Sequence, residues 1–418
     1  MARPLSMIRS LSPLLKQSFR SAVLAVGLTS LFAAGCQTNH VPATAQVAEI
    51  PAGSFTSKWN ADLALKGDKA TDIFVRDNLI IVYTREHFAY VLDRESGASK
   101  WVAQVSAGGV KLRPPIVLKD YVVFPSISTM EVYDRFGRHH RSVQAQGLAL
   151  RSGATGYGTR VFFGADDPNG GRVVSLDLAG SQYQSSSVIW TLQTLSGISA
   201  TPVIHQGLLY AGDDSGGVYA VNADSRAPIW PIKHENREQG VFDAGNGIRA
   251  DMKADEFGVY VALLDTKLYC IGRTDGRIRW QYFSGQPLLH SPTITPTGVY
   301  LYIDDKGLIA IDKTQGDPAR KAKWTVAAAR QFLAEDDKYA YLEGNDHTIL
   351  AADKASGEVK FRSKRTDFIA YGTSIKSTVV YAVTADGEVR AVTPVLTAGS
   401  LGPVVWAPAE MEAVATIR

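Results

Sequence analysis

The chain has little cysteine, with only Cys36 and Cys270 among its 418 residues. A framework of several disulfides, as found in small exported domains, is therefore excluded. The chain also lacks an excess of either charge. The first 35 residues hold four basic side chains and no acidic one, which leaves 40 basic against 41 acidic residues in the remainder. This balance argues against nucleic acid or an anionic membrane surface as a partner, because binding to either needs a basic surface.

Motifs for catalysis or metal binding are missing as well. The sequence contains no Ser/His/Asp order, no Gly-rich phosphate loop and no metal-spaced set of histidines. A calcium site needs several converging oxygen ligands. We interpret the acidic clusters at 166–167, 304–305 and 335–337 as solvated turns between strands instead. The pair His139-His140 occupies the docking position of a weak copy of the repeat, where we expect an exposed strand end. The sequence thus predicts no catalytic residue, no bound metal and no cofactor.

Long apolar runs are absent except near the N-terminus, where residues 21–35 read SAVLAVGLTSLFAAG. This run follows basic residues and is too short to span a bilayer comfortably. It resembles a bacterial lipoprotein signal. The resemblance implies a lipobox of Ala33, Ala34, Gly35 and Cys36, cleavage before Cys36, and diacylglycerol on its thiol. Gln37 in the next position favours the outer membrane.

We therefore expect a signal peptide over residues 1–35 and a flexible tether over 36–55. Each buried methylene contributes about 0.8 kcal/mol, so several acyl chains would hold the protein at a membrane. The alternative is a secretory signal cut near Ala34, with Cys36 incidental. Cys270 has apolar neighbours, and we expect it to be a small buried side chain on a strand.

The chain does contain a repeated sequence motif. YVLDRESGASKW at 90–101 returns in recognisable form at 173–190, 218–230, 268–280, 308–324 and 349–361, with weaker copies at 130–141 and 389–395. The spacing of about 40 to 50 residues is typical of a propeller or a solenoid.

The copies share one order of residue types. Alternating apolar residues predict a half-buried strand, and an Asp at the turn entry can accept hydrogen bonds from following amides. Gly97, Gly276, Gly316 and Gly357 can supply the positive φ of the turn. The large aromatic that ends the second strand suggests a side chain that docks on the neighbouring repeat. The predicted docking residues are Trp59, Trp101, Trp190, Trp230, Trp280 and Trp324. A further pair of apolar strands precedes each copy, so a repeat supplies about four strands.

The pattern Ala-x-Asp-x-x-Ser/Thr-Gly-x-x-x-Trp resembles the tryptophan-docking repeat of the quinoprotein-type (PQQ-like) β-propellers. The resemblance covers nearly the whole mature chain. It implies an all-β fold, an eight-bladed propeller of four-stranded antiparallel blades over residues 56–408, followed by a C-terminal tail over 409–418. Closing the ring explains how so many sheets avoid exposed edges. Either the strand around Trp59 or the one around Trp406 could complete the last blade.

Two branches of this family differ in function. The enzymatic branch binds a quinone and calcium, is usually longer, and often has adjacent cysteines, which are absent here. The non-enzymatic branch is a better match, because an exported, lipid-anchored propeller of this size resembles the BamB family of outer-membrane protein assembly factors. That resemblance implies a periplasm-facing, non-catalytic scaffold that binds the β-barrel insertase. Exposed edges could also capture extended clients by β-augmentation.

The resemblance also indicates two interaction loops. The family's Leu-x-Leu-Arg-Gly loop corresponds to LQTLSGISATP at 192–202, where Leu195 and Gly197 match but Ser196 replaces the Arg. Its Asp-x-Asp loop corresponds to RADMKAD at 249–255, where Asp251 matches but Lys253 has the opposite sign. The partner surface could have changed, the partner could be unrelated, or these could be ordinary solvated loops.

An alternative function is a periplasmic module that binds a small molecule or a polymer at the central funnel. The longest insertion, GVFDAGNGIRADMKAD at 240–255, is a typical place for recognition. Phe242, Arg249 and Asp251 would suit such a site. A ligand that binds only the folded state would raise the thermal midpoint. A quinone-dependent dehydrogenase is the third possibility.

Overall fold

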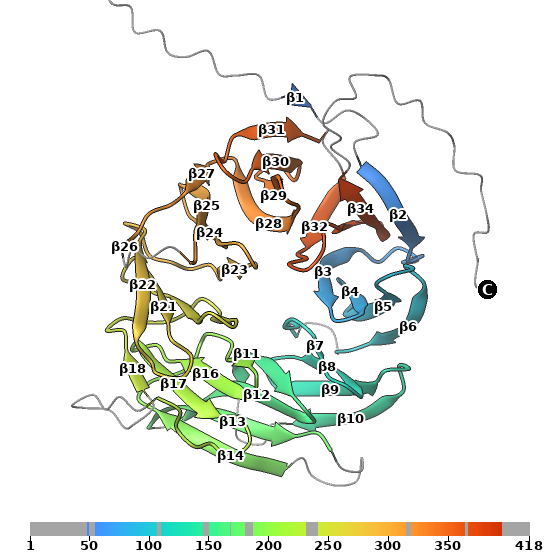
Figure 1. The fold of residues 1–418 in the computed structure, drawn as a ribbon. Coiled ribbons are helices and arrows are strands. Elements are labelled where there is room, and N and C mark those ends of the chain that lie inside the picture. The colour runs from blue at the N-terminus through green and yellow to red at the C-terminus, as the bar shows by residue number, and fades with distance from the viewer. Residues whose placement is uncertain are drawn as a thin grey trace, which may run out of the picture. The chain divides into compact units, whose positions relative to one another are not determined.

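Eight β-sheets form the fold in the computed structural model. The structure describes residues 48–49, 55–106, 110–144, 150–167, 169–179, 187–230, 241–314, 319–363 and 367–394. In these ranges every regular element is a β-strand, and the described residues belong to one compact unit. The sheets stand around a common axis as the blades of a propeller (Figure 1). The predicted all-β, eight-bladed propeller is therefore confirmed.

Each blade is a meander of four antiparallel strands. Blades 1 to 4 consist of β3 (Ala70–Arg76), β4 (Leu79–Thr84), β5 (Phe88–Asp93) and β6 (Ser99–Gln104); β7 (Ile116–Val117), β8 (Tyr121–Pro125), β9 (Thr129–Asp134) and β10 (His139–Gln144); β11 (Leu150–Tyr157), β12 (Arg160–Asp167), β13 (Gly170–Asp177) and β14 (Ser187–Thr194); and β15 (Val203–His205), β16 (Leu208–Gly212), β17 (Gly217–Asn222) and β18 (Val241–Asp243).

Blades 5 to 8 follow the same plan. They consist of β19 (Lys253–Ala254), β20 (Val259–Ala262), β21 (Lys267–Ile271) and β22 (Ile278–Phe283); β23 (Thr293–Ile294), β24 (Val299–Ile303), β25 (Gly307–Ile311) and β27 (Trp324–Val326); β28 (Ala329–Glu335), β29 (Tyr339–Gly344), β30 (Ile349–Asp353) and β31 (Val359–Arg362); and β32 (Phe368–Gly372), β33 (Val380–Thr384), β34 (Glu388–Pro394) and β2 (Phe55–Asp62). Two short strands, β1 (Ala48–Glu49) and β26 (Ala319–Arg320), add in parallel to the outer edges of blades 7 and 5.

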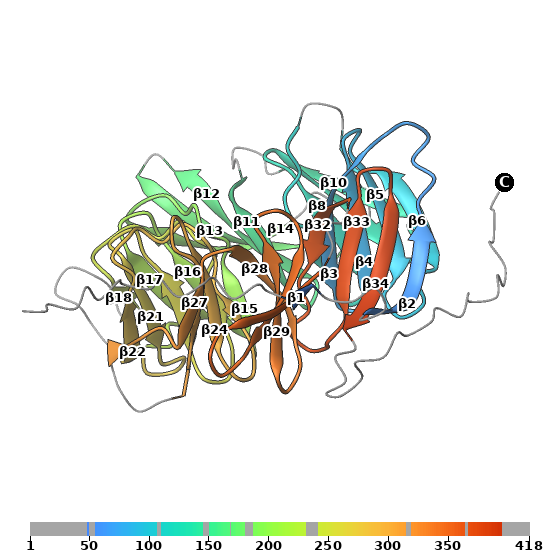
Figure 2. The same cartoon turned by 90° about the horizontal axis from the view of Figure 1, so that it is seen from above.

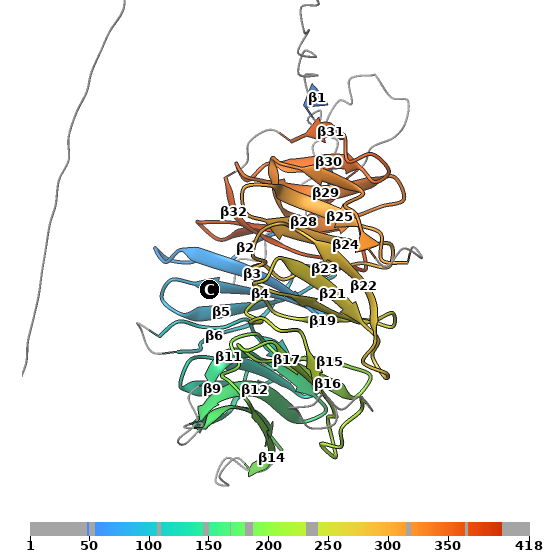
Figure 3. The same cartoon turned by 90° about the vertical axis from the view of Figure 1, so that its left-hand side faces the viewer.

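The first strand of each blade lies innermost. First strands of neighbouring blades contact one another, as β7, β11, β15, β19 and β23 do in succession. Figure 3 shows the order β28, β29, β30 and β31 within one blade, and Figure 2 shows β33 and β34 running between the two faces of the ring. In an antiparallel meander, the loops between blades and the turns between second and third strands share one face. We call this the connecting face and the opposite one the turn face.

The blades are joined by tryptophans. In six blades, the indole Nε1 donates a hydrogen bond of 2.8–3.2 Å to a backbone carbonyl of the next blade. The bonds run from Trp59 to Arg94, Trp101 to Arg135, Trp190 to Ala223, Trp230 to Arg273, Trp280 to Lys313 and Trp324 to Lys354. Each bond satisfies the indole N–H while the ring covers the neighbouring sheet, which explains the fixed place of this residue in the repeat.

The turn glycines have a second role that the sequence did not indicate. Gly276 has a φ of +68°, and a Cβ atom there would lie 2.8 Å from the Trp230 ring. Gly97 repeats the arrangement against Trp59, with a φ of +73° and a distance of 2.4 Å. The glycine is therefore needed both for the backbone conformation and for the close approach of the preceding blade.

Blade 2 departs from the pattern in a way that corrects the sequence interpretation. His139 and His140 do not occupy its docking position. Arg141 does, because it pairs with Val132 as Trp101 pairs with Val91 in blade 1. The Arg141 side chain is buried and its Nη2 donates to the carbonyl of Asp177 in blade 3.

Cations at the start of the turn between the third and fourth strands also join the blades. Lys313 is buried, and its Nζ lies 2.7 Å from Asp255 Oδ2 of blade 5 and 2.6 Å from the carbonyl of Thr295 in its own blade. Arg94, Arg135 and Arg273 likewise bond both to a turn of their own blade and to the preceding blade. These links run along the turn face of the ring.

The N-terminal strand closes the ring. β2 pairs antiparallel with β34, with Trp59 opposite Ala391, so the two ends of the propeller share blade 8 (Figure 1). Of the two candidates for this place, the structure shows the strand of Trp59. Trp406 lies outside the described residues, as does Cys36.

Candidate functional site

Three segments of the connecting face meet around blade 4. They are the loop 195–202 between β14 and β15, the turn 213–216 between β16 and β17, and the loop 244–252 between β18 and β19. Asp214 N donates to the carbonyl of Gly197 over 2.8 Å, and Asp251 Oδ1 accepts from Thr201 N over 2.8 Å. The two loops predicted from the sequence therefore form one continuous surface. We call it the blade 4 surface.

Leu195 is the exposed apolar side chain of this surface, with 60% of its area accessible. Its backbone is held firmly. Leu195 N donates to the hydroxyl of Tyr219 over 3.0 Å, and that hydroxyl donates to Asp213 Oδ2 over 2.9 Å. Asp213 is fully buried, and its other oxygen accepts from Ser215 N and Gly217 N. A buried carboxylate thus fixes an exposed leucine, which lowers the entropy cost of binding a partner there.

Beside Gly197 the structure places a cation that sequence reasoning missed. Arg151, in the innermost strand β11, packs so closely that a Cβ at Gly197 would lie 2.8 Å from Arg151 Cζ. Its Nη1 lies 2.8 Å from Asp166 Oδ1 and its Nη2 lies 2.6 Å from Asp214 Oδ2. The bond to Asp166, opposed in part by burial, raises the pKa of Arg151. The positive charge expected at the position of Ser196 is thus supplied from another strand, but two aspartates already pair with it.

The positions of two neighbouring acidic residues correct an earlier interpretation. Asp166 and Asp167 do not form a turn, because both belong to β12 and pair with Gly171 and Gly170 of β13. Asp304 and Asp305 do lie in a turn, between β24 and β25. Among the described residues, no group of three or more His, Cys, Asp or Glu side chains is placed to hold a metal ion.

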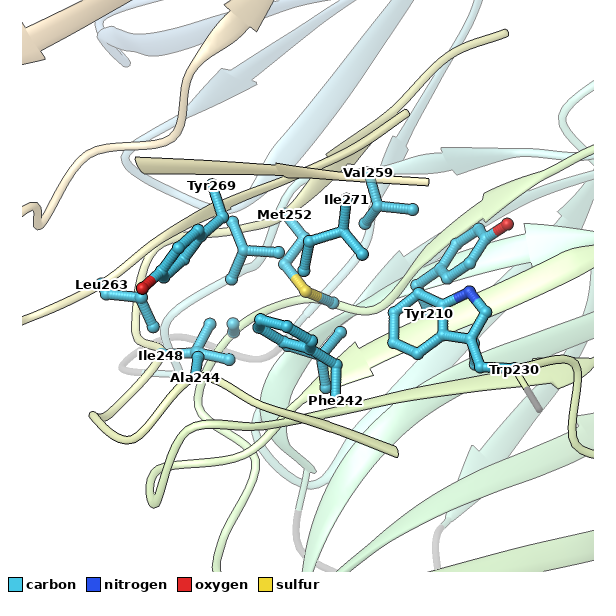
Figure 4. Packing of buried hydrophobic residues seen from close by; sticks show 14 residues of the cluster. Tyr210, Trp230, Phe242, Ala244, Ile248, Met252, Val259, Leu263, Tyr269 and Ile271 are labelled. Atoms are coloured by element: carbon cyan, nitrogen blue, oxygen red, sulfur yellow. The ribbon is translucent and has the colours of Figure 1, made fainter. Parts of the chain in front are cut away.

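Phe242 does not belong to the exposed surface. It lies in β18 with 9% of its area accessible, and its ring centroid is 5.8 Å from that of Tyr269. Figure 4 shows it within the cluster that also holds Met252 and Trp230. Its role in the structure is packing between blades 4 and 5.

The remaining predicted residues have different environments. Arg249 is exposed on the loop 244–252. Asp251 is half-buried, and besides holding Thr201 its backbone carbonyl accepts from Ser291 Oγ over 2.8 Å. Asp251 therefore positions both the preceding and the following inter-blade loop. Cys270 is buried in β21, as its apolar neighbours predicted. In the part of the chain that the structure describes, no helix is long and apolar enough to cross a membrane.

Comparison with known proteins gives a family match and several solved structures with a similar fold. The model of the family described as outer membrane protein assembly factor BamB matches residues 40–246 and 214–330. No curated protein matches the sequence. BamB from Moraxella catarrhalis superposes with a TM-score of 0.58 at 15% identity, over 81% of this chain and 97% of that one.

Other solved propellers are similar to the same degree. The quinohemoprotein alcohol dehydrogenase ADHIIG from Pseudomonas putida HK5 gives a TM-score of 0.56 at 14% identity, over 85% of this chain and 78% of that one. The C-terminal WD40 domain of Sif2 gives 0.57 at 9% identity, over 83% of this chain and 99% of that one. At such identities the superpositions establish a shared fold and do not distinguish a scaffold from an enzyme.

Proposed function

Because the chain belongs to the family of the outer membrane protein assembly factor BamB, we propose that it is a non-catalytic scaffold for protein–protein interaction in the assembly of outer-membrane β-barrel proteins. The observation that carries the proposal is Leu195, a large apolar side chain that is 60% exposed while its backbone is fixed through Tyr219 to buried Asp213. Rigid, exposed apolar side chains are typical anchors of protein interfaces.

The surroundings of Leu195 support the same role. Arg151, Asp166 and Asp214 form a charged rim beside it, and Arg249 is exposed on the adjoining loop. An apolar centre with a polar rim is the usual composition of a protein interface. The partner we propose is the β-barrel insertase, with extended clients as a second class of partner. Neither nucleic acid nor a cofactor is part of the proposal.

The lipid anchor is a separate element of the proposal. We infer that Cys36 carries acyl chains and holds the propeller at the periplasmic side of the outer membrane. Labelling of growing cells with radioactive palmitate should mark the wild type but not a Cys36→Ala variant, which should also move from the membrane to the soluble fraction. A labelled variant, or one that stays in the membrane, would contradict the anchor.

The scaffold role is tested by affinity purification of the tagged protein from mildly solubilised membranes, with co-purifying proteins identified by mass spectrometry. Leu195→Asp is compared with Phe136→Asp, since Phe136 is 79% exposed in the turn between β9 and β10 on the turn face. We expect the wild type and Phe136→Asp to recover the insertase and Leu195→Asp to recover at least about tenfold less, as for a binding hot spot. Equal recovery by both variants, or none by the membrane-bound wild type, would overturn the proposal.

The assignment as a non-enzyme needs its own test, because quinone enzymes share the fold. The purified protein is incubated with the quinone and calcium, and its absorption spectrum and dye-linked oxidation of alcohols and sugars are measured. We expect neither a spectral change nor oxidation. Stoichiometric binding of the quinone together with turnover would replace the scaffold by a dehydrogenase.

A further inference from the structure

Three cationic residues stand in or next to the innermost strands of the ring. Arg76 is the last residue of β3, Arg113 lies in the loop that leads into β7, and Lys253 is the first residue of β19. Blades 1 and 5 lie opposite each other in a ring of eight, so β3 and β19, which carry Arg76 and Lys253, stand on opposite sides of the axis. None of the three takes part in the blade 4 surface.

The partners of these cations are mostly neutral. Arg76 Nε donates to the carbonyl of Pro115 over 3.1 Å and its Nη1 donates to that of Val75 over 3.0 Å. Arg113 Nη2 donates to the carbonyls of Leu150 and Arg151 over 3.0 and 2.8 Å. Carbonyl groups orient a guanidinium but do not neutralise its charge.

Some N–H groups of these cations have no hydrogen-bond acceptor among the described residues. Arg113 Nε is buried and has no acceptor among the described residues. Within the same described part of the chain, no hydrogen bond or ion pair joins the half-buried Lys253 to another side chain. A buried donor without an acceptor costs about 1–3 kcal/mol, so an acceptor supplied from outside would be stabilised here.

The charges are close enough to influence one another. Burial lowers the pKa of Lys253; Asp251 opposes this shift and Arg76 adds to it. Burial also lowers the pKa of Arg113, again opposed by Asp251, and burial lowers the pKa of Arg76. A single carboxylate is thus shared by cations on two sides of the axis. The three cations and Asp251 together leave an excess of two positive charges.

We propose that the axis of the propeller binds a small oxyanion with two negative charges, of the inorganic phosphate class, through Lys253, Arg76 and Arg113. Such an ion matches the excess charge and offers several acceptor oxygens to the unused donors. A guanidinium binds an oxyanion through a planar pair of N–H groups, and an ammonium contributes a compact point charge. Asp251 opposes the lowering of the Lys253 pKa by burial, and its negative charge disfavours the anion on the side of the connecting face.

The experiment uses the full-length protein in detergent, with inorganic phosphate as the probe and chloride at the same ionic strength as the reference. Thermal unfolding and titration calorimetry are measured for the wild type, Lys253→Met, and Lys119→Met as a matched control. Lys119 is an exposed lysine between β7 and β8 on the turn face. We expect phosphate to raise the midpoint of the wild type and of Lys119→Met in a saturable way.

Lys253→Met should bind phosphate at least about tenfold more weakly, because a charge-assisted bond is removed. In phosphate-free buffer the same variant should unfold at a higher temperature than the wild type, since the cost of burying the Lys253 charge is removed together with its repulsion from Arg76. If Lys253→Met does not fold, Lys253→Gln provides the same comparison. The proposal is overturned if phosphate gives the wild type no more protection than chloride, or if the folded Lys253 variant binds as tightly as the control.

Discussion

Arg141 occupies a docking position that six other blades fill with tryptophan. Its side chain is buried, yet its Nε and Nη1 have no acceptor among the described residues. A buried cation with unused donors is costly. The position therefore contributes less to stability than its equivalents do.

The change Arg141→Trp should stabilise the protein. An indole would cover blade 3 and could donate its N–H toward the carbonyl that Arg141 now uses. We expect a gain of about 1 kcal/mol in the free energy of unfolding, as is common when a repeat is brought to its consensus. Urea unfolding checks this, with Lys119→Trp as an exposed control that should change little. A loss of stability would mean that the blade 2–blade 3 junction cannot accommodate the indole.

Thr266 carries backbone strain at the equivalent of a glycine. Its φ is +82°, while Gly216 and Gly387 have φ values of +94° and +95° at the corresponding position of their turns. A β-branched residue is disfavoured in this region of backbone space. Glycine would remove this backbone strain, but its flexibility in the unfolded chain offsets part of the effect. We therefore expect Thr266→Gly to raise the free energy of unfolding by about 0.5 kcal/mol.

The control for Thr266→Gly is Thr293→Gly in β23, where φ is not positive and glycine should lower the stability. Chemical unfolding of the two variants against the wild type gives the comparison. A destabilised Thr266→Gly variant would show that the threonine side chain contributes more than its backbone costs.

At the scale of the element, the turn between the third and fourth strands of a blade is built on a carboxylate. Asp93 Oδ1 accepts from Glu95 N and Ser96 N over 3.1 Å each, and Asp353 Oδ1 repeats the arrangement with Ser356 N over 2.9 Å. The bond from the Ser96 backbone is the main cause that lowers the pKa of Asp93, and that from Ser356 lowers the pKa of Asp353. Asn222 has the same position in blade 4 and accepts from Ser225 N over 2.8 Å.

The lowered pKa values of these turn carboxyls predict that the free energy of unfolding falls in acid. A carboxyl whose pKa is lower in the folded state stabilises the fold above its unfolded pKa of about 3.9 and loses this contribution as the pH falls through the folded pKa. Replacing Asp93 and Asp353 by Asn keeps an acceptor oxygen but removes the proton linkage. We expect the double variant to lose stability less steeply below about pH 4. Unfolding free energies measured at neutral and acidic pH check this, and parallel curves would contradict it.

At the scale of the whole molecule, stability depends on closing the ring. β2 and β34 bring the two ends of the propeller into one blade, and Trp59 then bonds to Arg94 of blade 1. The sheets of blades 8 and 1 share a buried cluster that includes Trp59, Ile80 and Tyr381. Blade 8 is the place where strands from both ends of the propeller pair. Separating these strands would open the ring and expose the sheets of the two flanking blades.

Trp59→Ala should lower the free energy of unfolding by about 3–5 kcal/mol, as for other large buried aromatics. Trp324→Ala is the matched control, because its indole makes the same bond and is buried to a similar degree. Hydrogen exchange should accelerate in β33 and β34 for Trp59→Ala but in blades 6 and 7 for Trp324→Ala. Equal exchange patterns would show that the closing blade is no weaker than the others.

The sequence predicted the fold correctly, because each repeat carries its own strands, turn and docking residue in a short stretch of chain. It did not predict the candidate site to the same extent. Phe242 was considered for a recognition site but is buried, and the sequence did not show this because an irregular insertion has no periodicity from which burial can be read. Arg151 was missed because it reaches Gly197 only through the packing of blade 3 against blade 4.

By itself, then, the sequence determined that the chain folds as eight repeated four-stranded blades, since local alternation, turn chemistry and a docking aromatic recur within it. Only the tertiary structure decided which strand closes the ring, that Arg141 takes a docking position, and that Leu195 is held rigidly at the surface. It also placed Arg76 and Lys253 in the innermost strands of opposite blades. Such contacts join residues far apart in the chain, and their geometry depends on how whole blades pack.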